Sequence, residues 1–138
     1  MSKKQRSIYL LIAGILQISL SFVCAFIGVV GLAATLTIVG AAPEPIFQWQ
    51  LAISVYALLA FTLGFTGGVL TLKQTRLLLA ITGLIAILSW NIFAIVYSLR
   101  NMPKTSSDII MWLAIFIFQV IFACISLAFT MTSRKEFH

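Results

Sequence analysis

The chain has 138 residues, of which 62% are hydrophobic and 9% are charged, and its formal net charge is +6. Soluble domains carry about 25% charged residues, so this composition, with a mean hydropathy of +1.13, excludes a soluble globular protein. The predicted membrane crossings use nearly the whole length, and we therefore expect one transmembrane domain over residues 1–138.

Four uncharged stretches are long enough to cross a bilayer. A hydrocarbon core about 30 Å thick needs about 20 helical residues per crossing. The predicted spans are 8–38, 47–72, 77–99 and 109–131. The sequence therefore predicts an all-α fold, an integral membrane bundle of four transmembrane helices.

The first span is unusually long and follows a basic N-terminal segment. Lys3, Lys4 and Arg6 precede it, as in a signal peptide, but the apolar region of a cleavable signal is only about 7–15 residues long. We expect this segment to remain as a membrane anchor. From Ile8 to Ile38 a helix would measure about 46 Å, so it is expected to tilt, bend or project from the bilayer.

Small residues flank the hinge between the second and third spans. Gly64, Gly67 and Gly68 come before it, and Ala80 and Gly83 come after it. In lipid, such faces let helices approach closely. The hinge, residues 73–76, is short enough to make the two helices antiparallel neighbours. We expect the glycine face to meet the third helix or a partner helix, with the intramolecular contact preferred.

Three long polar side chains lie within the spans: Gln17, Asn91 and Gln119. Counted from the ends of their helices, Gln17 lies about 14 Å deep and Gln119 about 18 Å deep. This predicts that helices one and four adjoin and that the amides bond to each other or to neighbouring backbone. A polar permeation path through all three residues is the alternative.

Several other residues have expected structural roles. Asp108 is predicted to cap the N-terminus of the fourth helix. Trp90 and Tyr56 lie deep in their spans, where they are expected to face neighbouring helices, with a quinone or lipid pocket beside Trp90 as the alternative. Cys24 and Cys124 lie at different depths and are interpreted as small core residues rather than a disulfide.

Lysine and arginine indicate the orientation of the chain. The two terminal segments and the 73–76 hinge together hold Lys3, Lys4, Arg6, Lys73, Arg76, Arg134 and Lys135, whereas the opposite side holds only Arg100 and Lys104. Cytoplasmic loops gather basic residues, so both termini are predicted to be cytoplasmic in a multi-pass protein of the plasma membrane. Anionic lipid headgroups explain the positive charge, and no nucleic-acid partner is expected.

The same inventory argues against several activities. Proton-coupled transport usually uses a carboxylate or histidine inside the membrane, but the acids lie at the C-terminus or in loops and the one histidine is His138. Two cysteines and this histidine are too few for a metal site made by one chain. We expect no metal, no cofactor, no catalytic residue and no enzyme activity.

Residues 67–88, GGVLTLKQTRLLLAITGLIAIL, resemble a segment of many small prokaryotic four-helix membrane proteins of unknown function. In that segment a double glycine precedes a leucine-lysine hinge and a second glycine-bearing helix. The resemblance implies the four-helix fold and a plasma-membrane location, and it carries over no catalytic residue.

The function expected from these features is that of a non-catalytic accessory or structural subunit, which packs against other transmembrane subunits and membrane lipids. A stand-alone homo-oligomeric channel or transporter is the first alternative. A lipid- or quinone-binding membrane module is the second.

Overall fold

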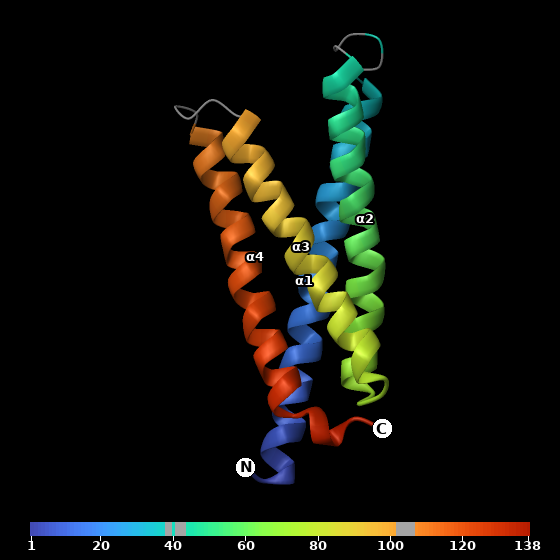
Figure 1. Ribbon diagram of the computed structural model, residues 1–138, viewed down its shortest axis with the longest axis vertical. Helices are drawn as coiled ribbons and strands as arrows, with labels where there is room; N and C mark the ends of the chain where they lie inside the picture. The colour runs from blue at the N-terminus through green and yellow to red at the C-terminus, as the bar shows by residue number, and fades with distance from the viewer. Residues whose placement is uncertain (38–39, 41–43, 102–106) are drawn as a thin grey trace.

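The chain folds into four long helices, shown in Figure 1. The structure is a computed structural model that describes residues 1–37, 40, 44–101 and 107–138. Its elements are α1 (Lys3–Thr37), α2 (Glu44–Leu72), α3 (Leu77–Asn101), α4 (Ser107–Thr132) and the 3-10 turn η1 (Arg134–Glu136). Each of the four helices contains a stretch that is long and apolar enough to cross a membrane. The predicted all-helical architecture is confirmed, and the predicted spans fall on α1 to α4.

The helices form a ring in chain order. Both α1 and α3 pack against α2 and against α4, while the diagonal pair α1 and α3 meets only over a short stretch. Both chain termini lie at the same end as the α2–α3 turn (Figure 1). We call this the terminal end of the bundle, and the opposite end the distal end. The first turns of α1 extend beyond the other helices at the terminal end, so the expected extra length of this helix projects from the bundle.

Small residues allow α1 and α2 to pack closely at two levels of the bundle. Near the terminal end, a Cβ added to Gly14 would lie 3.2 Å from the carbonyl oxygen of Gly68. Near the distal end, a Cβ on Gly28 would lie 3.2 Å from the carbonyl oxygen of Ser54. Backbone that approaches this closely leaves no room for a side chain, so these glycines allow the tight contact.

The two helix pairs separate toward the distal end. Figure 1 shows α3 and α4 diverging from α1 and α2 there. The residues between the pairs explain the divergence: Gly64 and Gly83 are buried near the α2–α3 turn, whereas the fully buried Trp90 occupies the more distal part of α3. Trp90 packs edge-on against Phe116 of α4, with 5.6 Å between ring centroids. The bulky rings act as a spacer where the small residues end.

The C-terminal segment folds back across the terminal end. The backbone N–H of His138 donates to the carbonyl oxygen of Gln74 at 2.8 Å, and the N–H of Arg76 donates to the carbonyl oxygen of His138 at 3.4 Å. Gln74 and Arg76 both have left-handed backbone conformations, with φ of 55° and 51°. The C-terminus of α2 ends in a Schellman-type turn, in which Gln74 occupies the position that usually holds glycine.

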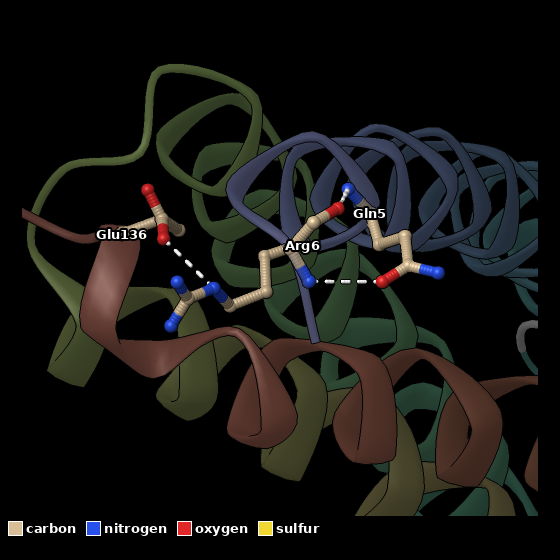
Figure 2. A network of polar contacts seen from close by, with 4 residues as sticks. Gln5, Arg6 and Glu136 are labelled. Carbon is tan, nitrogen blue, oxygen red and sulfur yellow. Dashed lines mark hydrogen bonds and ion pairs between the residues drawn. The ribbon is translucent and has the colours of Figure 1, made fainter.

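A salt bridge links the same segment to the start of α1. Figure 2 shows the Arg6 side chain reaching Glu136 in η1, with 3.0 Å between Nε and the carboxylate oxygen. In the turn before it, Ser2 and Gln5 form a capping box: the Gln5 N–H donates to Ser2 Oγ at 3.2 Å, and the Ser2 N–H donates to Gln5 Oε1 at 2.9 Å. The beginning and the end of the described chain are therefore joined through side chains.

Candidate functional site

Gln17 is the centre of a buried polar cluster near the terminal end. Its side chain is fully buried. Its Nε2 donates to the carbonyl oxygen of Ala80 on α3 at 3.1 Å. Its Oε1 lies 3.3 Å from the Thr71 hydroxyl of α2, whose one proton it shares with the Gly67 carbonyl oxygen at 2.9 Å. One amide thus joins three helices, and both ends of that amide have a partner.

The small residues around the hinge lie inside the chain's own bundle. A Cβ on Gly67 would lie 2.5 Å from Gln17 Nε2, and one on Gly64 would lie 2.5 Å from Ser21 Oγ. A Cβ on Gly68 would lie 2.6 Å from a side-chain carbon of Ile18. Ala80 and Gly83 of α3 are buried on the other side of the same contact. In this arrangement the glycine face contacts α1 and α3 of the same chain.

Gln119 and Asn91 lie in a second polar region, closer to the distal end. Cys24 Sγ donates to Gln119 Oε1 at 3.8 Å, and Asn91 Nδ2 donates to the carbonyl oxygen of Ile87 in its own helix at 2.8 Å. The remaining amide atoms, Gln119 Nε2 and Asn91 Oδ1, are buried and have no hydrogen-bond partner among the described residues. Gln17 therefore bonds to neighbouring backbone, the second of the two expected arrangements. It does not pair with Gln119, because Gln119 is level with Cys24, two helical turns farther along α1.

The predicted adjacency of α1 and α4 is nevertheless present. Ser126 Oγ donates to the carbonyl oxygen of Ala13 at 2.9 Å, and the rings of Tyr9 and Phe129 stack with 4.8 Å between centroids.

Cys24 is buried and Cys124 is exposed, and both are free thiols. The interpretation of both cysteines as core residues is thus wrong for Cys124, which lies on the outside of α4.

Asp108 lies within the first turn of α4, one residue after the helix begins at Ser107. A carboxylate in this position interacts favourably with the partial positive charge at a helix N-terminus.

A cleft opens between the two helix pairs at the distal end. Its volume is about 290 Å³, and all four helices contribute to its walls. The lining residues are Phe26, Ile27, Val30, Gly31 and Ala34 of α1, Gln50, Ile53 and Ser54 of α2, Ala94, Tyr97 and Ser98 of α3, and Trp112 and Phe116 of α4. This concave site follows from the spacing effect of the aromatic side chains.

Aromatic rings close the base of the cleft. Trp90 lies behind Phe116, and its ring N–H donates to the carbonyl oxygen of Ile53 at 3.2 Å. Phe116 in turn stacks with Trp112, with 6.0 Å between centroids. Tyr56, the other deep aromatic residue, contacts Ser89 Oγ at 2.5 Å and joins α2 to α3. Both aromatic residues therefore face neighbouring helices, and Trp90 also supports a pocket.

The polar lining of the cleft is concentrated on α2 and α3. Gln50 and Ser54 lie four residues apart on α2, and Tyr97 and Ser98 belong to α3. Ser54 Oγ donates to the backbone carbonyl oxygen of Gln50 at 2.9 Å, whereas Gln50 Oε1 is buried without a partner among the described residues. None of the lining residues is charged.

Sequence reasoning did not identify Gln50, Ser54 or Ser98 as site residues. The available signal was their position: each is a polar residue near the distal end of its helix, and Gln50 and Ser54 lie four positions apart on the same face. That position identifies these residues as cleft-lining only once the separation of the helix pairs is known. Among the described residues, no group of three or more His, Cys, Asp or Glu side chains is placed to hold a metal ion.

Four apolar helices around an uncharged cleft indicate a multi-pass membrane protein with an all-helical fold. Comparison with protein-family models, with curated proteins and with solved structures gave no match to this chain.

Proposed function

We propose that the chain is a non-catalytic accessory subunit, which packs against other transmembrane subunits of a membrane protein complex through the exposed face of α4. The observation that carries this proposal is a stacked pair of phenylalanines on that face. Phe118 and Phe122 lie with their ring centroids 6.3 Å apart, and they are 61% and 40% exposed. Ile117, Ile121 and Ile125 extend the same exposed surface.

The chemistry of this pair supports a protein partner. Phe118 and Phe122 lie near the middle of α4, away from its ends. Aromatic residues, phenylalanine among them, are enriched in the cores of protein interfaces. α4 is in addition the least buried of the four candidate spans.

The distribution of charge supports a role without proton transfer. Among the described residues, no Lys, Arg, Asp, Glu or His side chain is buried, and the buried polar side chains are amides and hydroxyls. Intramembrane ionisable groups are the usual elements of proton and ion coupling. An accessory role needs none of them.

The test is purification from the native membrane in mild detergent, followed by identification of the proteins that co-migrate with the chain. Phe118→Ala combined with Phe122→Ala should release the partner subunits. The matched control is Leu59→Ala combined with Leu63→Ala, an exposed pair on α2 with the same spacing, which should retain them. If the chain purifies alone as a uniform species, the accessory role is wrong, and flux through liposomes of the purified chain tests the channel alternative.

The proposed location is the plasma membrane, with the terminal end in the cytoplasm. The basic residues Lys3, Lys73, Arg76 and Arg134 belong to this end, and of the described residues only Arg100 is a basic residue toward the distal end. In a variant lacking Cys24 and Cys124, a membrane-impermeant maleimide added to intact cells should label Gly40→Cys but not Ser2→Cys. The reverse labelling pattern would show the opposite orientation.

A further inference from the structure

The distal cleft has the size and composition of a small-molecule site. Its volume of about 290 Å³ lies at the lower limit of the range of about 300–1,000 Å³ that is typical of ligand pockets. Such pockets are mainly apolar and contain a few polar groups that orient the ligand. Here Trp112 and Phe116 supply a wide apolar surface, and Gln50 and Ser54 supply polar atoms on the neighbouring helix pair.

The charge of an occupant follows from the lining. None of the lining residues is a Lys, Arg, Asp, Glu or His. A charged group inside the cleft would have no counter-ion among the lining residues, and burying an unpaired charge is costly. The occupant should therefore be neutral.

The hydrogen-bonding group of an occupant follows from Gln50. Its Oε1 is buried without a partner among the described residues, and a buried polar atom without a hydrogen bond lowers stability. A hydroxyl group can either donate or accept, so it fits this amide in either of its two flipped orientations. Ser54 Oγ already donates its proton to the backbone of Gln50, so it can only accept. The single proton of the hydroxyl goes to Gln50 Oε1, or, when the flipped Gln50 amide donates to the hydroxyl, to Ser54 Oγ.

We propose that the distal cleft binds a neutral membrane lipid that carries a free hydroxyl group, with the hydroxyl on Gln50 and Ser54 and the apolar portion against Trp112 and Phe116. A diacylglycerol and a prenylated quinol both have this chemistry. The site is independent of the partner surface on α4, so either proposal can fail without the other.

Tryptophan fluorescence provides the test, because Trp112 lines the cleft and Trp90 packs behind the lining residue Phe116. The purified full-length chain carrying Trp49→Phe, which removes a half-exposed tryptophan outside the cleft lining, is titrated in detergent with lipids that bear brominated chains as quenchers. The probes are a diacylglycerol and a prenylated quinol. The controls are a triacylglycerol, which lacks the free hydroxyl, and a phosphatidylglycerol, which is charged.

We expect saturable quenching by at least one hydroxyl probe and at least tenfold weaker binding of both controls. Binding of the diacylglycerol alone or of the quinol alone supports the proposal and identifies the source of the hydroxyl. Equal binding of all four lipids would overturn it, since chain filling without recognition would then explain the quenching. Absence of quenching by both hydroxyl probes would also overturn it.

Two variants locate the site. Gln50→Leu should weaken binding of the hydroxyl probe at least tenfold, whereas Gln48→Leu, on an exposed position of the same helix, should leave binding unchanged. Ala34→Phe places a ring at an exposed position in the cleft wall and should compete with the ligand without disturbing the core. Unchanged binding in both Gln50→Leu and Ala34→Phe would show that the hydroxyl lipid binds elsewhere.

Discussion

The side-chain amide of Gln17 on α1 donates to the backbone carbonyl oxygen of Ala80 on α3, with 3.1 Å between the two atoms. This hydrogen bond joins the two diagonal helices of the bundle, which otherwise have little contact. It also fixes the rotation of α1, because the same amide accepts from Thr71 on α2.

Replacing Gln17 with leucine should lower the free energy of unfolding by about 1–2 kcal/mol, since two interhelical hydrogen bonds averaging about 0.6 kcal/mol are lost together with a well-fitted side chain. Unfolding in mixed micelles with increasing denaturing detergent measures the change. Ser19→Ala is the control, because the exposed Ser19 bonds only to the Ile15 carbonyl in its own helix. Equal stability of Gln17→Leu and the control would contradict a structural role for the amide.

Gly67 should tolerate no side chain. A Cβ there would lie 3.0 Å from the carbonyl oxygen of Ala80 and 2.5 Å from Gln17 Nε2, and helix backbone cannot move aside locally. Gly67→Ala should therefore destabilise the bundle by about 1–3 kcal/mol, the usual effect of overpacking, in the same micelle assay. Ala52→Leu adds more volume at an exposed position of α2 and should change stability by less than about 0.5 kcal/mol.

Gln74→Gly should stabilise the protein. Gln74 has a φ of 55°, a left-handed conformation that costs an L-residue about 1–2 kcal/mol. Glycine removes this strain but has more freedom in the unfolded chain, which offsets about 0.5–1 kcal/mol. The net gain should be about 0.5–1 kcal/mol, measured as a shift in thermal unfolding. Thr75→Gly should be destabilising, because Thr75 is not among the residues with positive φ. A loss of stability in Gln74→Gly would refute the strain at this turn.

The salt bridge between Arg6 and Glu136 should hold the C-terminal segment in place, although its contribution is modest. The two side chains are 24% and 13% exposed, and ion pairs near the surface contribute about 0–1 kcal/mol. Glu136→Arg should increase protease cleavage after residue 133 up to about fivefold, and adding Arg6→Glu should restore resistance. Arg134→Glu, at an exposed position next to it, is the control. Failure of the double variant to recover would mean that the backbone bonds of His138 hold the segment alone.

The four long apolar helices could be predicted from the sequence, because a bilayer demands such helices and this demand does not depend on how they pack. The partner of Gln119 could not be predicted in the same way. Depth counted from helix ends assumes that all helices end at the same level, but α1 begins at Lys3 and projects beyond the end of α4. Gln119 therefore meets Cys24 instead of Gln17.

The cleft is a second feature that only the packed structure reveals. Trp90 was expected to face neighbouring helices, and a pocket beside it was one alternative. Its effect on helix spacing depends on Phe116, which is 26 residues away in the sequence and packs against it from α4. No local pattern connects these two rings, so the divergence of the helix pairs and the polar lining at Gln50 and Ser54 are tertiary properties.

The hydroxyl groups on the outer faces have a consequence for biogenesis. Thr62, Thr66 and Thr82 are exposed, and each donates to the carbonyl oxygen four residues earlier in its own helix, at 3.0, 2.8 and 2.9 Å. A helix that satisfies its hydroxyls internally can enter the lipid as a finished unit, before any neighbour has been synthesised. The bonds from Gln17 to Ala80 and from Ser126 to Ala13 form only when the helices meet. We therefore expect insertion and assembly to be separable events in this chain, with assembly following the synthesis of α3 and α4.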